Sequence, residues 1–424
     1  MITVPSTMCR EWSEVFRRLG RGRVRSDVVF EWIAGRDGLT LQAVGPEVAV
    51  RHHIPGRRHD ARGTGSLESF AIPNGSTESN AILRLDARRS SKPFPAEPKR
   101  FTPVPGLWAA LAAATSVTAR ESESRFVLNR IQLRGGRKAI VASDSKQLLV
   151  QTGFAFPWSD DVLVPSSDIF AALAERTPPE TAVARTPGHV FIRSGPWTVA
   201  LAIDSGGRFP DVDPLLVRAE KAGSELIVGE ADRARLMREI PRLPGGRLEN
   251  RSVTIDLTGP AVRTGDASAS NMSIGLSQSR VHGRRLAVTC DRTYLLAALK
   301  LGFTRMIVST ADQPLVWRDD QRTYLFLPLA ECESSPSTAA PSKPPMTRGP
   351  RRPEPKAPPV VSKRPQSKRP PPAPVHPRPK EAPLPAVKVK TKTPRSRRPP
   401  PRPKPGLWSG LWSRVRGVFR TKDC

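Results

Sequence analysis

The sequence predicts an α+β protein in which β-α-β-β-β units are repeated and a disordered basic tail follows. Three observations support this fold class. An order of helix, hairpin and further strand returns three times within the first 330 residues, and two of the repeats contain a second half of the same kind. The repeats are 99 and then 122 residues apart, measured from Val44 to Ser143 and on to Gly265. This spacing is much longer than a solenoid period, so it predicts separate domains.

The last part of the chain differs in composition from the rest. The protein has 68 Lys and Arg against 39 Asp and Glu, a formal net charge of +29. Residues 341–424 contain 23 Lys and Arg, 3 acidic residues and 23 of the 46 prolines, so they carry +20 and the other residues carry +9. A segment of this kind cannot bury enough apolar surface to offset the entropy of ordering, so we expect it to be disordered.

The first repeat begins with an amphipathic helix over residues 7–19, which places apolar side chains on one face. A hairpin follows, with strands over 28–34 and 39–44 and a Gly-Arg-Asp-Gly turn between them. A third strand is predicted over 47–54. Residues 66–91 offer a strand or two and no convincing helix, so the second half of this repeat is short.

The second and third repeats follow the same order. The second has a helix over 106–119 and strands over 126–133, 138–144 and 147–154; the third has a helix over 231–240 and strands over 251–257, 261–266 and 272–278. Each then has a strand, a cap and a helix, over 160–176 and 284–302. Ser166, Ser167 or Asp168 is the expected cap of the first helix, and Asp291 that of the second. Three strands complete each repeat, over 181–186, 189–195 and 197–204, and over 304–310, 314–320 and 323–329.

Cysteine and histidine usage predicts neither a metal nor a cofactor. The four cysteines are far apart and form no CxxC pair, which favours reduced thiols in a cytoplasmic protein. His52, His53 and His59 are close in sequence, but further zinc ligands are missing, so we interpret them as part of a solvated loop. The N-terminal residues show no apolar signal-peptide core, and no stretch approaches 18 apolar residues.

Three blocks in the second and third repeats resemble one known family. RFVLNRIQLRGGRKAIVASDSKQLLV (125–150) is similar to the start of that family's second domain, and DSGGRFPDVDPLLV (204–217) to the linker between its second and third domains. LAVTCDRTYLLAALKLGFTRMIVST with TYLFLPL (286–310 and 323–329) is similar to its last half-domain. Over roughly residues 7–330 the chain therefore resembles the bacterial DNA polymerase III beta subunit, the beta sliding clamp.

This resemblance implies an architecture and a function. The three clamp domains correspond to residues 1–100, 101–212 and 213–331, followed by a disordered tail over 332–405 and an amphipathic, Trp-containing segment over 406–424. Such clamps pair head to tail into a ring with helices inside and sheets outside. They encircle duplex DNA and tether the polymerase without catalysis. The implied partners are duplex DNA, DNA polymerase, clamp-loader subunits and a second copy of the chain, in the cytoplasm at the nucleoid.

Arginines on three equivalent helices are the candidate DNA contacts. Neutralising phosphates with arginine is independent of base sequence and permits sliding. The alternative for any single arginine is a solvated helix face. The candidates are Arg17, Arg18, Arg21, Arg23, Arg120, Arg125, Arg233, Arg235, Arg238 and Arg242. The family's DNA-contacting loop maps to Arg125, Phe126 and Val127, where Val127 breaks the usual aromatic pair.

The family's partner-peptide pocket lies between the second and third domains. By residue-to-residue resemblance it maps to Leu128, Ser143, Ser145, Lys146, Gln147, Leu148, Val217, Leu325, Phe326, Leu327, Pro328 and Leu329. Apolar residues dominate, as a peptide anchor requires. The alternative is an ordinary interdomain core. Lys146 and Gln147 stand where the family has His-Arg, and Ser145 replaces the turn glycine.

Other functions stay open at this stage. The short first domain favours a diverged clamp that no longer closes a ring and acts as a DNA-bound adaptor or regulator. The 95 residues after Leu329 suit binding to nucleic acid, to the chain's own pocket or to a membrane surface. An enzyme such as a nuclease would need its acids to bind metal. The paired acids Glu121 with Glu123 and Asp211 with Asp213 each lie beside a predicted linker or loop, without further metal-binding residues around them.

Overall fold

The computed structural model describes residues 2–19, 29–56, 58, 60–66, 80–83, 92–119, 127–219, 223–244, 251–264 and 272–329. The chain divides into two units, residues 1–331 and 332–424, and every described residue belongs to the first. The expected disordered tail and the terminal amphipathic segment therefore lie outside the described residues.

The first repeat has the elements that the sequence predicts. They are β1 (Ile2–Pro5), α1 (Ser6–Arg17), β2 (Val29–Gly35), β3 (Gly38–Val44), β4 (Val48–Pro55), β5 (Ala61–Ser66) and β6 (Asn80–Leu83). The helix, the hairpin and the third strand are confirmed; β1 and β5 were not predicted. Gly38 has a φ of +135°, and a Cβ there would meet the Ile54 carbonyl oxygen at 2.0 Å. Only glycine fits this turn.

The second repeat contains both of its predicted halves. Its elements are β7 (Thr102–Pro103), α2 (Leu107–Val117), β8 (Arg130–Arg134), β9 (Ala139–Ser143), β10 (Gln147–Thr152), β11 (Asp161–Pro165), α3 (Ile169–Arg176), β12 (Ala182–Arg185), β13 (His189–Ser194) and β14 (Trp197–Ala202). The strand expected from residue 126 begins only at Arg130, because the Arg130 N–H closes a turn on the Val127 carbonyl (3.2 Å). Asp168 precedes α3 without a side-chain cap bond, and Ser167 Oγ accepts only a long one from the Ile169 N–H (3.5 Å).

The third repeat begins after a short helix that the sequence did not predict, α4 (Asp213–Ala219). Its elements are β15 (Ser224–Ile227), α5 (Glu230–Glu239), the 3-10 turn Ile240–Arg242, β16 (Ser252–Asp256), β17 (Ala261–Thr264), β18 (Ser273–Gly275), β19 (Arg280–His282), β20 (Ala287–Asp291), α6 (Arg292–Lys300), β21 (Arg305–Val308), β22 (Leu315–Arg318) and β23 (Arg322–Phe326). The predicted cap of α6 is confirmed, since Asp291 Oδ1 accepts from the Thr293 N–H at 2.7 Å.

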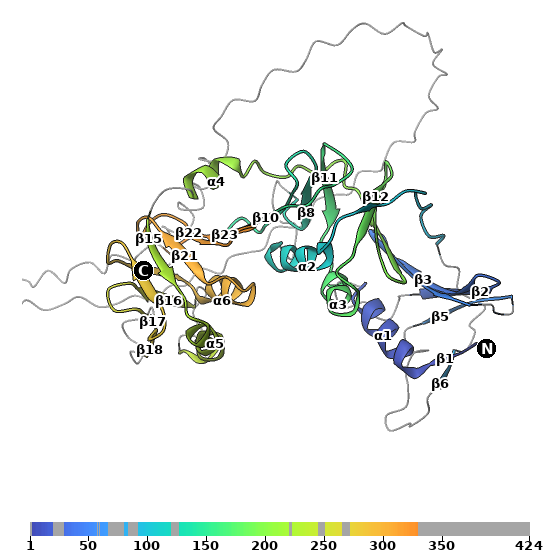
Figure 1. Cartoon of the computed structure of the whole chain (residues 1–424), viewed down its shortest axis with the longest axis horizontal. Helices are drawn as coiled ribbons and strands as arrows, with labels where there is room; N and C mark the ends of the chain where they lie inside the picture. Colours follow the sequence, from blue (N-terminus) through green and yellow to red (C-terminus); the bar gives the residue numbers. More distant parts are fainter. Residues whose placement is uncertain are drawn as a thin grey trace, which may run out of the picture. The chain divides into compact units, whose positions relative to one another are not determined.

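Strands from different repeats join edge to edge into two large sheets (Figure 1). An eight-stranded sheet has the order β5-β2-β3-β4-β14-β13-β12-β7, so β4 of the first repeat pairs with β14 of the second. A nine-stranded sheet has the order β11-β8-β9-β10-β23-β22-β21-β15-β19, and there β10 pairs with β23. A four-stranded sheet, β18-β17-β16-β20, and the pair β1-β6 complete the strands that the structure describes. The predicted α+β class is confirmed.

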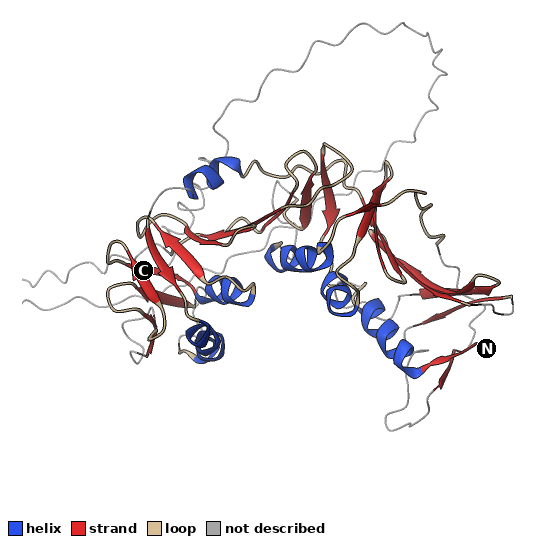
Figure 2. Cartoon of the chain, in the orientation of Figure 1, coloured by secondary structure: helices blue, strands red, loops and turns tan. Residues whose placement is uncertain are grey.

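Apolar side chains between helices and sheets form the main core. Figure 2 shows α1, α2 and α3 on one side of the strands. Trp12 and Phe16 of α1 are fully buried, and Phe16 packs edge-on against Trp197 of β14 with ring centroids 6.3 Å apart. Leu295 and Leu299 of α6 belong to the same core cluster. Apolar side chains recur about every four residues along each helix and every two residues along each strand, and they therefore meet in one layer.

Residues 92–101 cover part of the opposite sheet face. Phe94 packs in a separate cluster with Ala49, Ala200 and Phe191, across the β4–β14 pairing. Arg51 lies over the Phe94 ring at 3.9 Å and forms an ion pair with Glu97 at 2.6 Å. These residues contain neither helix nor strand, and no helix occurs in the described residues between Val29 and Phe101.

Candidate functional site

The β10–β23 pairing brings together residues of the predicted peptide pocket from two repeats. Gln147 lies opposite Phe326 and Leu148 opposite Leu325 in this antiparallel ladder. The Leu327 N–H extends the pairing by donating to the Lys146 carbonyl at 3.2 Å. Residues about 180 positions apart in sequence thus form one continuous surface and core.

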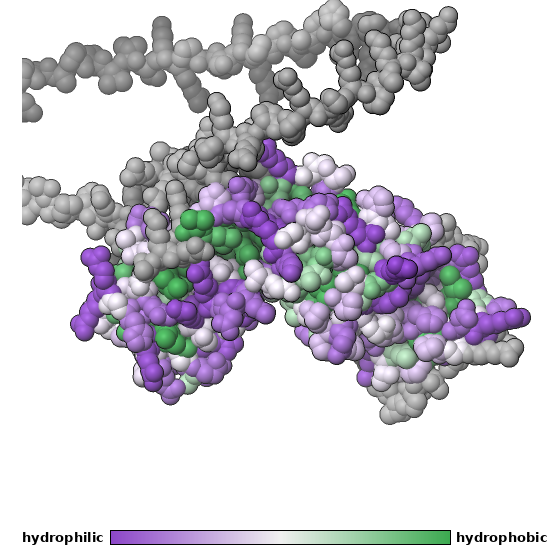
Figure 3. Space-filling view, turned by 45° about the horizontal axis from the view of Figure 1, so that its top comes forward, coloured by the Kyte–Doolittle hydropathy of each residue, from purple (hydrophilic) through white to green (hydrophobic). Residues whose placement is uncertain are grey.

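Burial divides the predicted pocket residues into two groups. The buried group, at most 7 % exposed, consists of Leu128, Ser143, Gln147, Leu148, Leu325 and Phe326. Of these, Phe326 belongs to the main core. The Leu128 carbonyl accepts from the Ala119 N–H (3.0 Å) beside the end of α2. The residues with accessible surface are Ser145, Lys146, Val217, Leu327, Pro328 and Leu329. Val217 on α4 is 67 % exposed. Figure 3 shows hydrophobic surface gathered among hydrophilic residues in the left half of the view.

A buried hydrogen-bond chain lies beneath this surface. The Tyr324 hydroxyl donates to Gln147 Oε1 at 2.6 Å, and Gln147 Nε2 donates to Asp144 Oδ2 at 2.8 Å. Asp144 Oδ1 accepts from the N–H groups of Lys146 and Gln147, both at 2.9 Å. Burial raises the pKa of Asp144 above its ordinary value, although these bonds oppose the rise. The chain fixes the 143–147 turn, in which Ser145 has a φ of +82°.

Two arginines hold α4 against the β8–β9 turn. Arg134, which is buried, pairs with Asp213 at 2.7 Å, and Arg137 pairs with the second oxygen of the same carboxylate. Partial burial alone would raise the pKa of Asp213, but the hydrogen bonds from both arginines outweigh it and lower that pKa. Asp213 is thus committed to a structural contact and does not pair with Asp211 to bind metal. In the described part of the chain no group of three His, Cys, Asp or Glu side chains could hold a metal ion. Glu121 and Glu123 lie outside that part.

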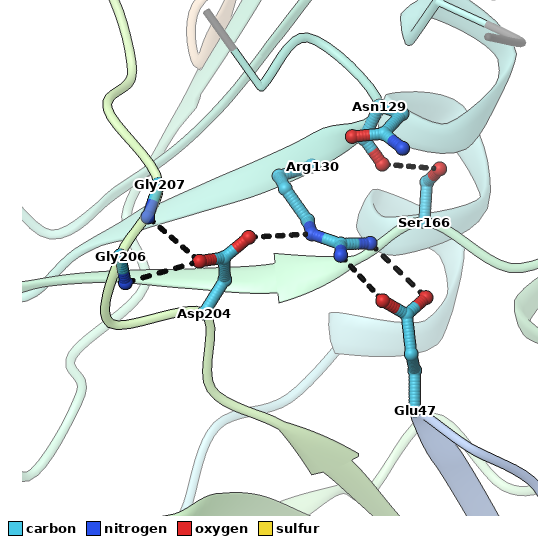
Figure 4. Close-up of polar contacts among 7 residues, drawn as sticks. All are labelled: Glu47, Asn129, Arg130, Ser166, Asp204, Gly206 and Gly207. Atoms are coloured by element: carbon cyan, nitrogen blue, oxygen red, sulfur yellow. Dashed lines mark hydrogen bonds and ion pairs between the residues drawn. The ribbon is translucent and has the colours of Figure 1, made fainter. Parts of the chain in front are cut away.

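Arg130 connects the two large sheets (Figure 4). Its guanidinium donates to both carboxylate oxygens of Glu47, just before β4, and its Nε donates to Asp204 Oδ2 at 3.1 Å, just after β14. Asp204 Oδ1 accepts in turn from the N–H groups of Gly206 (3.2 Å) and Gly207 (2.7 Å). This contact shapes the start of the Gly-Arg-Phe-Pro-Asp segment. Sequence reasoning missed it, because Glu47 and Arg130 are 83 residues apart.

The predicted DNA-contacting arginines differ in how free they are. Arg17 is exposed at the end of α1, whereas Arg18 pairs with Glu14 at 3.0 Å. On α5, Arg233 pairs with Glu230 at 2.6 Å and Arg235 with Glu239 at 3.1 Å. The remaining candidates on this segment are Arg238, which lies 3.5 Å from Glu239, and Arg242, which is exposed.

The expected excess of basic over acidic side chains on these helices is therefore only partly present. Residues 230–242 carry four arginines against three acids, and α2 has no charged residue. Arg21, Arg23, Arg120, Arg125 and Phe126 lie outside the described residues. None of the described helices is long and apolar enough to cross a membrane.

Comparison with known proteins identifies the fold. No protein-family model and no curated protein matches this sequence. Solved structures do match. The DNA polymerase beta subunit of Streptococcus pyogenes is 15 % identical with a TM-score of 0.62, and the match covers 77 % of this chain and 99 % of that chain. The DNA polymerase III beta subunit of Thermotoga maritima is 14 % identical, with a TM-score of 0.61 and coverage of 78 % and 99 %. The sliding clamp of Bartonella birtlesii is 16 % identical, with a TM-score of 0.62 and the same coverage. About three-quarters of this chain therefore has the sliding-clamp fold of bacterial DNA polymerase III beta subunits, as the sequence blocks implied.

Proposed function

We propose that this protein is a clamp-like processivity factor of a DNA polymerase III complex, without catalytic activity of its own. It holds or encircles duplex DNA without sequence specificity and tethers DNA polymerase and other replication or repair partners. The observation that carries the proposal is the sliding-clamp fold, which spans nearly the full length of the matched clamps. Its expected location is the cytoplasm, at the nucleoid.

Exposed arginines on α1, on α5 and on the 3-10 turn after α5 support the DNA-holding part. Arg17, Arg238 and Arg242 reach solvent from helices that share one core with the sheets. Their contacts to phosphate need no base recognition, so the protein can move along the duplex.

The surface beside the β10–β23 pairing supports the tethering part. Leu327, Pro328 and Leu329 offer accessible apolar area next to a hydrogen-bonded turn, and Val217 on α4 is a further exposed apolar side chain. Apolar side chains on a fixed backbone suit the anchor residues of a short linear peptide.

Retention on DNA of different topology tests the proposal. The full chain is loaded by a bacterial clamp loader onto a nicked circle, and the same DNA is then linearised. A clamp stays on the circle at high salt and leaves the linear form by sliding off the ends. Equal loss from both forms would contradict encirclement.

A second candidate is a clamp-like adaptor or regulator that does not close a ring, and one observation favours it. In the internal junctions, the third strand of one half-unit (β4, β10) pairs with the last strand of another (β14, β23). β18 is the equivalent of β4 and β10. Its pairing partner in another copy would be the last strand of the first repeat. In the other two repeats that last strand ends 17 residues after the end of β12 and 18 residues after the end of β21, so after β6 it would end near residues 100–101. The structure instead places residues 92–101 against the outer sheet face, without a strand.

The solution mass of the full chain separates these two candidates. Light scattering after size exclusion, in high salt to suppress charge-driven association, gives a dimer for a closed ring. A monomer that still binds clamp-binding peptides would favour the adaptor.

A further inference from the structure

Three arginines near the end of the nine-stranded sheet form a basic strip that the proposed function does not use. Arg280 lies on β19, the last strand of that sheet, and Arg284 and Arg285 follow in the connection to β20. All three side chains are exposed. They are called here the β19 arginine strip.

The strand part of the strip, at Arg280, faces away from the helices. Arg280 lies opposite Ile227 of β15, which in turn lies opposite Arg305 of β21, so these three side chains share one face. Their neighbours Leu226 and Met306 point to the other face and are buried in the core shared with α5 and α6. A duplex held by the helices therefore does not reach the strip.

The backbone beneath the strip is held in place. The Ser224 hydroxyl donates to the Arg284 carbonyl at 2.7 Å. Gly283 has a φ of +98°, and a Cβ there would lie 3.1 Å from Ser224 Cα. The turn thus presents Arg284 and Arg285 from a fixed position beside Arg280.

Two acids on the neighbouring strands are already neutralised. Glu225, opposite His282 in the ladder, pairs with Arg305. Asp256, opposite Ala287, pairs with Arg263 at 2.9 Å. Within the described residues no ion pair involves Arg280, Arg284 or Arg285. Asp232 accepts from the Gln278 N–H and the Ser279 hydroxyl just before Arg280. With this third acid, five arginines and three acids leave a local charge of +2.

We propose that the β19 arginine strip binds the phosphate backbone of a second segment of nucleic acid, on the sheet face opposite the helices. Its most exposed large apolar side chain, Ile227, is only 38 % exposed, so charge dominates any contact. Guanidinium groups match phosphate geometry and release condensed counterions from a polynucleotide. An acidic protein offers the same sign of charge, but not the dense, regular phosphates that release counterions.

Salt-dependent binding of the full chain tests this site. The variant R280A/R284A/R285A is compared with the charge-matched control R36A/K99A/R100A, which removes three exposed basic side chains elsewhere, none of them in an ion pair within the described residues. Labelled single-stranded and duplex DNA of equal length are titrated by fluorescence anisotropy at several salt concentrations. We expect the slope of log K against log salt to become shallower by about 2–3 in the strip variant, on at least one of the two DNAs. The control keeps the slope of the unaltered chain, because the side chains that it removes lie outside the strip.

Two outcomes would overturn the proposal. Equal slopes of log K against log salt for the strip variant and the control would show that the strip does not bind DNA and is a solvated sheet edge. Loss of poly-glutamate binding with unchanged DNA slopes would assign the strip to an acidic protein. Retention on circular DNA is measured in parallel. We expect the strip variant to be retained like the unaltered chain, so a failure of clamp function is seen separately from a failure of this site.

Discussion

Ser145 is a residue whose backbone conformation conflicts with its side chain. Its φ of +82° lies in the left-handed region, where a Cβ is crowded, and it stands where the resembling family has glycine. We expect Ser145→Gly to stabilise the protein by about 0.5–1 kcal/mol, after the greater freedom of glycine in the unfolded chain is subtracted. Urea unfolding measures this change. Ser159→Gly, at a residue with no positive φ, serves as the control and should be slightly destabilising. If Ser145→Gly destabilised the protein, the proposed backbone strain at Ser145 would be contradicted.

His52 makes stability depend on pH. The predicted solvated loop is wrong for this residue, because His52 lies in β4 and is 3 % exposed. It packs between Trp12 and Trp197, with ring centroids 5.6 and 4.4 Å away. Burial, with a smaller contribution from His53, lowers the pKa of His52 to about 4. In the unfolded chain the value is about 6.5, so the unfolded state gains a proton first as the pH falls. Above pH 6.5 the ring is neutral in both states and the full free energy of unfolding is kept. Between about pH 6.5 and 4 the free energy of unfolding falls by about 3 kcal/mol.

Replacing the His52 imidazole by an aromatic ring that does not titrate tests whether His52 causes the loss of stability at low pH. His52→Phe keeps an aromatic side chain in the same site, and we expect its unfolding free energy to fall less between pH 7 and 4 than that of the unaltered protein. Urea titrations at several pH values give the comparison. Parallel curves for both proteins would assign the acid sensitivity to other groups.

At the scale of elements, the junctions between strands decide how repeats join. Arg130 of β8 binds Glu47 before β4 and Asp204 after β14, and its side chain is only 15 % exposed. We expect Arg130→Met to destabilise the protein by about 1–3 kcal/mol, because it leaves two carboxylates without their partner. Arg185→Met, which removes one surface pair with Asp160, should cost less than about 1 kcal/mol. Equal costs for the two variants in urea unfolding would show that Arg130 is no more than a surface contact.

The elements themselves were largely predictable. The helix at α1 and the strands β2, β3, β10 and β23 have strong local periodicity, and the glycines of the β2–β3 turn limit where the chain can reverse. α4 escaped prediction because its seven residues include a proline and are stabilised from outside, by Arg134 and Arg137 on Asp213. β19 escaped for a similar reason: it has three residues and depends on β15 for its hydrogen bonds.

At the scale of the whole molecule, the apolar surface beside the β10–β23 pairing is the expected point of partner attachment. Val217→Asp places a charge on its most exposed apolar residue. We expect about tenfold weaker binding of a fluorescent clamp-binding peptide, since an anchor contact is typically worth more than 1 kcal/mol. Met272→Asp, at another residue with an exposed apolar side chain (50 %), is the control and should leave the affinity unchanged. An equal affinity for both variants would move the peptide site elsewhere.

The sequence alone determined the repeated α+β units, the cap of α6 and the likeness to sliding clamps. These features depend on residues close in sequence, through helix and strand periods, turn glycines and the cap at Asp291. It named the residues on either side of β10–β23, but not which of them are buried. It also did not determine which arginines are neutralised by acids. Only the tertiary structure decided that Leu148, Leu325 and Phe326 are buried, that Arg233 and Arg235 have acidic partners, and that residues 92–101 cover a sheet face instead of extending one. Burial and ion pairing depend on segments far apart in the chain, and that information is absent from any local pattern.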